Sequence, residues 1–321
     1  MERAATQQPG RAMDLSTKIR QEISKAFVGS IRVMDLTLSC LLARGHLLIE
    51  DVPGVGKTTL AMSLARAMGG TFRRIQFTSD LMPSDVIGVS VYDQAQGDFR
   101  FLHGPVFSHV LLADEINRAT PRTQSALLEA MSEGQVTVDN ETHALPRPFF
   151  VAATQNPHEH FGTYPLPDSQ MDRFAMRIDI GYPERTDELR IVLGQQTADR
   201  ITDILAVTNP EEVRAAQEEV SSVHVDDSLT DYLLEVVDRT RHHPDVILGV
   251  SPRGARIWFQ VGRAHALVQG RTFTVPDDFI DTAEPVLAHR LVAAAEGAAG
   301  RSETASMAVL RRILDETPIP G

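Results

Sequence analysis

The stretch from His46 to Leu60, HLLIEDVPGVGKTTL, constrains the fold more than any other part of the chain. Its apolar run at residues 47–49 is typical of a buried parallel strand, and helical spacing begins at Thr58, directly after the glycines. A strand, a glycine loop and a helix start in this order form the context of a phosphate-binding loop. Unpaired N–H groups converge at such a helix N-terminus, where the helix macrodipole also favours an anion. The stretch therefore predicts a nucleotide-binding domain.

The loop supplies the residue types that phosphates and Mg²⁺ require. Lys57 is expected to reach the β- and γ-phosphates, and the Thr58 hydroxyl is expected to ligate Mg²⁺. One position departs from the pattern G-x-x-x-x-G-K-[ST], because Asp51 replaces the first glycine. A turn that contains Gly-Lys-Thr by chance is the alternative, but the flanking strand and helix favour nucleotide binding. The predicted nucleotide-binding residues of the loop are Pro53, Gly54, Val55, Gly56, Lys57, Thr58 and Thr59.

Two later strands end in polar side chains suited to ATP hydrolysis. Asp114 and Glu115 end an apolar strand, so Asp114 is expected to hold Mg²⁺ opposite Thr58 and Glu115 to act as the general base that polarises water. Asn156 ends the next strand and would lie at the same carboxyl edge of a parallel sheet, where its amide could orient the attacking water or contact the γ-phosphate. Taken alone, two acidic residues at a strand end are often exposed to solvent without a catalytic role, and Asn-Pro is common in turns.

Two arginines complete the predicted site. Arg173 precedes the fifth strand, and we expect it to offer its guanidinium to a phosphate bound by a neighbouring subunit. Arg253 begins a helix in the C-terminal part of the chain, and we expect it to reach the nucleotide from above. Taken singly, an arginine of this kind is more often a partner in a surface salt bridge.

Five apolar strands alternate with helical segments in the first part of the chain. This alternation predicts a doubly wound α/β fold on a parallel sheet. Two segments that alternate apolar and polar residues, 89–102 and 135–139, are expected to form β-structure outside that sheet. The five strands are expected at residues 47–49, 72–78, 109–115, 149–154 and 175–180.

Strand signals stop at about Pro183, and only helical patterns follow. We expect a flexible tail at residues 1–13, an α/β nucleotide-binding domain at 14–182 and an all-helical domain at 183–321. The helices of the last domain are predicted at residues 188–195, 211–218, 228–241, 253–269, 277–289 and 304–314.

Composition limits the class of protein. The net charge of −12 argues against a surface that coats nucleic acid, although a local basic groove or pore is compatible with it. The single cysteine, Cys40, lies in an apolar run and is predicted to be a packed thiol rather than a nucleophile. No apolar segment approaches the roughly 18–20 residues that span a bilayer, and the first ten residues lack the core of a signal peptide. We therefore expect a cytoplasmic protein.

The order of several short motifs resembles that of AAA+ ATPases and, more narrowly, that of the MoxR family. The phrase RIQFTSDLMPSDVIG at residues 74–88 and TQSALLEAMSE at 123–133 belong to the same resemblance, which extends from about Ala26 to the C-terminus. The ordered motifs are PGVGKT at 53–58, LLADEINRA at 111–119, ATQNP at 153–157, MDRF at 171–174 and SPR at 251–253.

The resemblance implies an AAA+ P-loop NTPase domain, with a five-stranded parallel sheet and helices on both faces, followed by a helical lid. It implies ATP/ADP and Mg²⁺ as ligands, with Thr58 and Asp114 on the metal. It also assigns roles to positions that match the motifs: Gly54 to Thr59 as Walker A, Asp114 and Glu115 as Walker B, Asn156 as sensor 1, Arg253 as sensor 2, Arg173 as arginine finger with Arg118 and Arg122 as alternatives, and Val28 and Gly29 around the adenine.

Members of the family that this chain resembles assemble as hexameric rings and act as chaperone-like remodelers. They often work with partners that carry von Willebrand factor A domains, in metal-cofactor insertion or complex maturation. The resemblance also implies that hairpins at residues 89–102 and 135–148 face a pore or a partner. The client protein is not specified by any residue of the sequence.

Other classes fit the sequence less well. A small-molecule kinase shares the phosphate loop but not the acidic pair, the sensor asparagine or the helical second domain. A GTPase would carry an Asn-Lys-x-Asp segment, which this sequence lacks. A ring that acts on DNA conflicts with the acidic balance. A nucleotide-gated scaffold that barely hydrolyses ATP conflicts with the intact Glu115.

Overall fold

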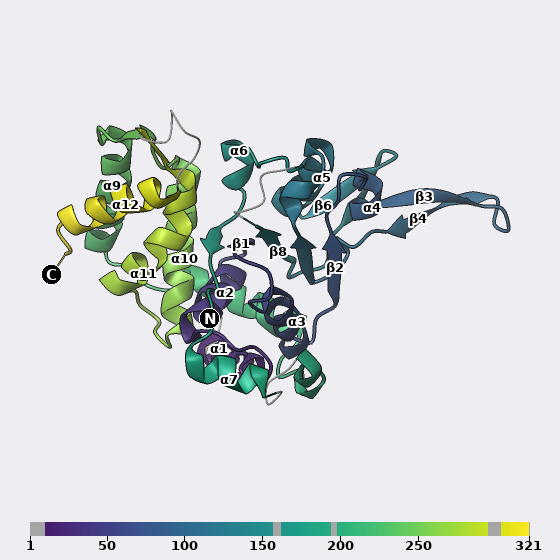
Figure 1. Ribbon diagram of the computed structural model, residues 1–321, viewed down its shortest axis with the longest axis horizontal. Helices are drawn as coiled ribbons and strands as arrows, with labels where there is room; N and C mark the ends of the chain where they lie inside the picture. Colours follow the sequence, from purple (N-terminus) through teal and green to yellow (C-terminus); the bar gives the residue numbers. More distant parts are fainter. Residues whose placement is uncertain (1–9, 157–161, 194–197, 295–302, 321) are drawn as a thin grey trace, which may run out of the picture.

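The computed structural model describes residues 10–156, 162–193, 198–294 and 303–320. Its centre is a five-stranded sheet in the order β2-β5-β8-β1-β9, and all of its neighbouring strands are parallel (Figure 1). The predicted parallel α/β sheet is thereby confirmed. The strands are β1 (Leu47–Glu50), β2 (Phe72–Gln76), β5 (Val110–Asp114), β8 (Phe150–Gln155) and β9 (Met176–Ile178).

Both faces of the sheet are buried, which explains the nearly continuous apolar runs of its strands. In β1, Leu47 and Ile49 join the core that contains residues of α1, α2 and α3, whereas Leu48 joins the core that contains residues of α4 and α5. The predicted helices on both faces are therefore present. These helices are α1 (Arg11–Ile23), α2 (Ile31–Leu42), α3 (Lys57–Ala67), α4 (Pro83–Ile87) and α5 (Pro121–Glu133), with the 3-10 turn η1 (Ile116–Arg118) and the short helix α6 (Asp168–Met171).

The N-terminal helix is longer than the sequence indicates. α1 begins at Arg11, inside the segment expected to be a tail, and residues 1–9 lie outside the described part of the chain. Ala12 is buried, and its N–H donates to Oε2 of Glu219 over 3.2 Å. Contact with the C-terminal half therefore extends the helix at a point where the local pattern is too polar to predict it.

The C-terminal half is helical, as predicted. Its helices are α7 (Arg185–Val192), α8 (Pro210–Glu219), α9 (Asp227–His242), α10 (Pro252–Val268), α11 (Pro276–Leu287) and α12 (Glu303–Glu316), with the 3-10 turns η2 (Ala198–Asp203), η3 (Val220–Ser222) and η4 (Ala288–Arg290). It also holds a two-stranded antiparallel sheet that the sequence did not indicate, β10 (Val246–Leu248) with β11 (Val292–Ala293). Both strands are too short to leave a pattern.

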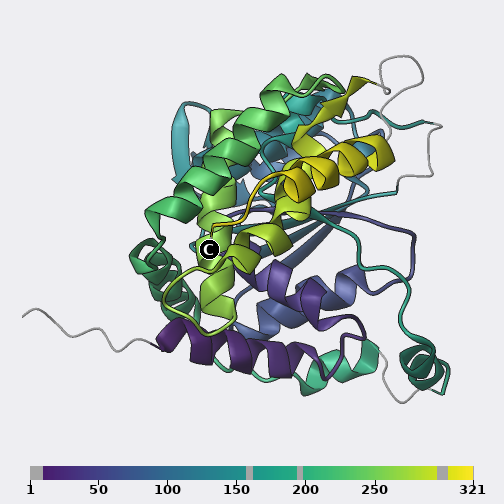
Figure 2. The same cartoon turned by 90° about the vertical axis from the view of Figure 1, so that its left-hand side faces the viewer.

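The two halves are joined along α2 and along the first helices after β9. α10 packs against α2, and Nε2 of Gln217 in α8 donates to the carbonyl of Leu41 in α2 over 2.7 Å. Arg66 in α3 donates from Nη1 to the carbonyl of Ile201 over 2.7 Å. Residues 201–217 thus hydrogen-bond to α2 and α3. In Figure 1, α9, α10, α11 and α12 lie together beside the α/β domain, and in Figure 2 the same green-to-yellow helices lie toward the viewer.

Both segments expected outside the main sheet are antiparallel hairpins. β3 (Gly88–Asp93) pairs with β4 (Asp98–His103), and this hairpin projects from the body of the molecule with Tyr92 and Phe99 exposed (Figure 1). β6 (Gln135–Val138) pairs with β7 (Glu141–Ala144) through a turn in which Asp139 and Asn140 have positive φ. The two hairpins touch where the ring of Phe101 stacks on that of His143, with centroids 4.1 Å apart.

Two predictions from composition can be compared with the described residues. Cys40 is fully buried, and burial raises the pKa of its thiol, so the prediction of a packed thiol is confirmed. In the described ranges, no helix combines the length and the apolar character that crossing a membrane requires.

Candidate active site

The phosphate loop lies between β1 and α3, and its two glycines have the left-handed backbone that other residues avoid. Gly54 has φ = 91° and Gly56 has φ = 95°, and Gly56 caps α3, which begins at Lys57. The buried ring of Phe27 packs beneath the loop, where a Cβ on Gly56 would lie 3.3 Å from Cε2 of Phe27. Val28 and Gly29, expected around the adenine, therefore follow a residue that contacts the loop.

Lys57 points from the first turn of α3 toward the start of the loop. Its Nζ donates a hydrogen bond to the carbonyl oxygen of Asp51. Burial lowers the pKa of Lys57, and the nearby carboxylates of Asp51, Asp114 and Glu115 act in the opposite direction. An ammonium held in front of this acidic edge is suited to meet a phosphate bound there.

The side chain of Asp51 explains why this loop lacks the first glycine. Its Oδ2 accepts hydrogen bonds from the N–H groups of Ile180 and Gly181, both over 2.7 Å, and its Oδ1 accepts from the N–H of Val52 over 2.7 Å. Asp51 is 9% exposed. The carboxylate therefore ties the start of the loop to the chain that leaves β9, a task that a glycine cannot perform.

Asp114 ends β5, and its carboxylate is held from two sides. Oδ1 accepts from the hydroxyl of Thr154 over 2.6 Å, and Oδ2 lies 2.6 Å from Nη2 of Arg74, which is on the neighbouring strand β2. Neither Thr154 nor Arg74 was among the predicted site residues. Thr154 had one usable signal, a polar residue within an otherwise apolar buried strand.

Glu115 has a backbone in the left-handed region, with φ = 55° and ψ = 50°, which is uncommon for a residue with a side chain. Its N–H donates to the hydroxyl oxygen of Thr154 over 2.8 Å. Its Oε2 accepts from Nε2 of Gln76 over 2.8 Å and lies 2.9 Å from Nε of Arg118. The expected base is thus engaged by two donors of its own chain.

Asn156 directly follows β8 at the same edge of the sheet. β8 lies between β5 and β1, with Gln155 opposite Glu50, so Asn156 follows the end of a strand that separates Asp114 from the phosphate loop. The carboxyl edge of the sheet therefore brings together Lys57, Asp114, Glu115 and Asn156, as the strand pattern indicated.

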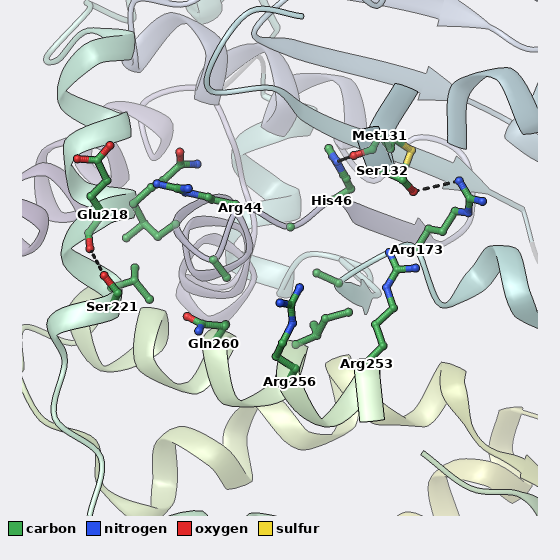
Figure 3. A pocket seen from close by; sticks show the side chains of 17 residues that line it. Arg44, His46, Met131, Ser132, Arg173, Glu218, Ser221, Arg253, Arg256 and Gln260 are labelled. Atoms are coloured by element: carbon green, nitrogen blue, oxygen red, sulfur yellow. Dashed lines mark hydrogen bonds between the residues drawn. The ribbon is translucent and has the colours of Figure 1, made fainter. Parts of the chain in front are cut away.

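Arg173 and Arg253 lie at the opposite edge. Both line a cavity of about 520 Å³ with Arg44 and His46, which directly precede β1 (Figure 3). Met176, three residues after Arg173, pairs with Leu47 at the amino end of β1. The phosphate loop follows the other end of that strand, about 13 Å away. The expectation that Arg253 reaches the nucleotide of its own chain is wrong for this arrangement, because α10 directs its N-terminus to the amino edge.

The cavity at the amino edge is rich in arginine. Arg253 and Arg256 extend from α10 toward the side where Arg173 and His46 lie (Figure 3). Nη1 of Arg173 donates to the carbonyl of Leu128 over 2.7 Å and to the hydroxyl of Ser132 over 3.0 Å, both on α5. Arg44 and Arg256 were not predicted, since their place in the cavity depends on how the two halves dock.

The two alternatives to Arg173 lie elsewhere. Arg118 is paired with Glu115 of its own chain, and Arg122 is exposed in the first turn of α5. Neither lines the arginine-rich cavity.

Comparisons with protein families match both halves of the chain. Residues 46–176 match the ATPase family associated with various cellular activities (AAA), and residues 238–311 match the AAA lid domain. The first match spans the phosphate loop, the acidic pair and the segment that carries Arg173.

Individual proteins match nearly the whole chain. The uncharacterized protein YeaC of Bacillus subtilis is 45% identical over 94% of this chain and 94% of its own length. Chaperone MoxR1 of Mycobacterium tuberculosis is 39% identical over 97% of this chain and 86% of its own length. A solved structure of a candidate ATPase from Cytophaga hutchinsonii superposes with a TM-score of 0.83 at 33% identity, covering 97% of both chains.

Proposed function

The chain belongs to the MoxR family of AAA+ ATPases, and from this premise we propose that it hydrolyses ATP at a site completed by a neighbouring copy of itself. One observation carries the proposal. Arg173 and Arg253 share a cavity at the amino edge of the sheet, whereas the phosphate loop lies at the carboxyl edge. Arginines in that position serve a phosphate that another protomer presents, as arginine fingers do in related NTPases.

Within one protomer, the carboxyl edge would bind ATP and prepare the water. The N–H groups of the loop and Lys57 would hold the phosphates, and Asn156 would orient the attacking water. Glu115 would accept the proton from that water as it attacks the γ-phosphate in line, giving ADP and phosphate. For this the Glu115 carboxylate must leave Gln76 and Arg118, which engage it in the present arrangement.

Thr58 and Asp114 fit a magnesium ion. Their hydroxyl and carboxylate oxygens are the hard ligands that Mg²⁺ prefers, and both residues lie at the carboxyl edge of the sheet, Thr58 in the first turn of α3 and Asp114 at the end of β5. Bound Mg²⁺ would neutralise charge that develops on the phosphate oxygens. Oδ2 of Asp114 would have to be shared with Arg74, or released by it, for the ion to bind.

A closed ring is the assembly that this arrangement favours. A protomer with its loop at one edge and its arginines at the other forms a head-to-tail interface, and such interfaces close into rings. We propose a hexamer, which is the ring size that the family resemblance implies. Hydrolysis in one protomer would then change how tightly the Arg253-bearing lid of its neighbour is held, and so rotate that lid.

Dilution tests the shared site. Turnover per chain should fall as protein concentration is lowered below the point at which the assembly dissociates, measured by light scattering on the same samples. Turnover should also stop when Mg²⁺ is chelated. A dissociated monomer that turns over at the full rate would overturn the proposal of a shared site.

The output of the reaction is proposed to be chaperone-like remodelling or maturation of a protein client. The relative named Chaperone MoxR1 supports this role, and the exposed apolar side chains of the β3–β4 hairpin offer a surface for a protein. A partner with a von Willebrand factor A domain and insertion of a metal cofactor remain proposals from the family resemblance, and a cytoplasmic location remains a proposal from the composition of the sequence. Co-purification of such a partner with the full chain would test the first of these.

Action on nucleic acid is the less favoured alternative. The net charge of −12 disfavours a surface that binds phosphate backbones. Titrating DNA at several salt concentrations would decide, because binding through phosphates weakens steeply as salt rises. A scaffold with little hydrolysis would instead show ATP binding without turnover in the presence of Mg²⁺.

A further inference from the structure

Arg290 is a buried arginine in η4, at the end of the lid helix α11. Only 6% of the residue is exposed. Its Nε lies 2.8 Å from Oδ1 of Asp172, which supplies the countercharge. Burial lowers the pKa of Arg290 to about 10, with Asp172 acting in the opposite direction, so the side chain remains a cation at neutral pH. A buried charge of this kind is costly unless its surroundings satisfy all of its donors.

Most hydrogen bonds of Arg290 go to the segment that carries Arg173, while Nη1 also donates to the carbonyl of Val286 in α11 and contacts Nε2 of His289. Nη2 donates to the carbonyl of Phe174 over 2.5 Å and to that of Asp172 over 3.3 Å, and Nη1 donates to the carbonyl of Ala175 over 3.3 Å. Arg290 thus hydrogen-bonds to main-chain carbonyls on both sides of Arg173. The Arg173 guanidinium points away to α5, where it bonds to Leu128 and Ser132.

The stem of Arg290 packs against the start of α10, which carries Arg253. A Cβ on Gly254 would lie 2.9 Å from Cδ of Arg290, so the side chain passes closely beneath the residue that follows Arg253. The positive charge of Arg253 also acts to lower the pKa of Arg290. Arg290 therefore contacts both segments whose arginines line the cavity.

The fork of an arginine suits this position better than any other side chain. Its five N–H donors lie in one plane and meet several carbonyls and a carboxylate at once, which a lysine cannot do. A hydrophobic residue of similar volume would fill the space without holding the carbonyls.

We propose that Arg290 is a positioning residue for the shared ATPase site, fixing Arg173 on the α/β domain at a set distance from Arg253 on the lid. The inference rests on the proposed function, because it requires both arginines to act on a neighbour's nucleotide. Motion of the lid then moves α11 and η4, and through Arg290 it moves the backbone of the segment that carries Arg173.

Mixed assemblies of full-length variants test the proposal. A Lys57→Ala protomer keeps its arginines but has no working nucleotide loop. An Arg173→Ala protomer keeps a working loop but lacks Arg173. Each variant alone should be inactive. An equal mixture should regain turnover at those interfaces where the intact phosphate loop of an Arg173→Ala protomer faces the intact arginines of a Lys57→Ala protomer. Arg290→Met is then added to one background or to the other.

The protomer that carries Arg290→Met distinguishes a positioning role of Arg290 from general damage to the fold. Arg290→Met in the Lys57→Ala protomer should lower the regained turnover by roughly 10- to 100-fold, the loss expected for a misplaced catalytic group. In the Arg173→Ala protomer it should change turnover by less than about twofold. Arg290→Lys in the Lys57→Ala protomer should give an intermediate loss of turnover. Adding Arg290→Met to the Arg173→Ala protomer, which keeps a working loop, should not change its affinity for a fluorescent ATP analogue, since the loop lies at the other edge.

Arg239→Met provides the matched control. Arg239 is also a lid arginine in an ion pair, with its Nε 2.7 Å from Oε1 of Glu235, but it lies on α9 and does not line the cavity. It should change turnover by less than about twofold in either background. An equal effect of Arg290→Met in both backgrounds, or no effect in either, would overturn the positioning role alone. A reference mixture that regains nothing would overturn the shared site, and the role of Arg290 with it.

Discussion

Nε2 of Gln76 donates a hydrogen bond over 2.8 Å to Oε2 of Glu115, the carboxylate proposed as the general base. Gln76 ends β2 and Glu115 follows β5, and the two strands are parallel neighbours at the edge of the sheet. A carboxylate oxygen that accepts from Gln76 and pairs with Arg118 is already occupied by donors of its own chain, so in this geometry it is not available to accept a proton from water. The contact therefore restrains the base when the site is not engaged.

Removal of this restraint is the first prediction. Gln76→Ala should raise the basal rate of ATP hydrolysis by roughly 2- to 10-fold, because a single hydrogen bond contributes about 0.5–1.5 kcal/mol. Steady-state phosphate release measures the rate, and the affinity for ATP should not change. Arg73→Ala, an exposed change on the same strand, is the control. A lower rate in Gln76→Ala would show that the contact assists the base instead of restraining it.

Glu115→Gln tests the role of the base itself. The amide keeps the volume of the side chain but cannot accept a proton, so turnover should fall by roughly 10²- to 10⁴-fold while ATP still binds. Single-turnover hydrolysis and titration with a fluorescent ATP analogue measure the two quantities separately. Turnover equal to that of the unchanged chain would remove Glu115 from this role.

Arg74 competes with a cation for Asp114. The ion pair is 2.6 Å long, and the Arg74 side chain is half exposed, so the interaction contributes only about 0.2–1 kcal/mol. Arg74→Ala should therefore lower the Mg²⁺ concentration that gives half-maximal turnover by roughly 1.5- to 5-fold. Arg74→Lys, which retains the charge, should lie closer to the unchanged chain. A higher requirement for Mg²⁺ in Arg74→Ala would indicate that Arg74 orients Asp114 for the ion.

Strand patterns predicted the parallel sheet, because a strand buried on both faces leaves a continuous apolar run that local sequence shows. The phosphate loop, Asp114, Glu115 and Asn156 could be located for the same reason, since each follows such a strand. Gln76 and Arg74 could not. They lie on an edge strand with exposed side chains, and their contacts depend on β2 being the neighbour of β5, which no local pattern states.

The position of Arg253 also depends on information that is absent from local sequence. Its helix was predicted correctly, but the side to which the helix points is decided by how α10 packs on α2. The same holds for Arg290, a charged residue whose burial follows from carbonyls on a segment 115 residues earlier. Long-range docking therefore decides the parts of the site that the sequence left open.

His46 gives the protein a pH-dependent stability. It is 7% exposed, its Nδ1 accepts from the N–H of Val151, and its Nε2 contacts the carbonyl of Met131. Burial lowers its pKa to about 4. Between about pH 6.5, the value for an unfolded histidine, and pH 4 the unfolded chain binds the extra proton, so stability is lost as pH falls through this window.

We expect the free energy of unfolding to fall by about 2 kcal/mol between pH 7 and pH 5 from this residue alone. His46→Gln, which offers one acceptor and one donor without titrating, should remove that share of the pH dependence. Urea unfolding at both pH values measures it, and the comparison within each variant cancels any constant cost of the substitution. An equal pH dependence in both proteins would contradict the assignment.

Asp51 leads to the last prediction, in which restoring the common glycine of the loop should harm the protein. Asp51→Gly leaves the N–H groups of Ile180 and Gly181 without the carboxylate that both now share. The unfolding free energy should fall by about 3 kcal/mol, because buried donors would lose a charged acceptor and an added glycine is more flexible. Thermal unfolding with and without ATP measures the loss.

Asp51→Asn separates the charge from the contact. Its single carbonyl oxygen can still accept from one or both of these N–H groups, so the loss should be about 1 kcal/mol. ATP affinity should fall in the same order, glycine variant below asparagine variant, because the carboxylate ties the start of the phosphate loop to the segment after β9. If the glycine variant were as stable as the unchanged chain, the aspartate would be only a tolerated substitution at this turn. The three short hydrogen bonds of its carboxylate predict the opposite.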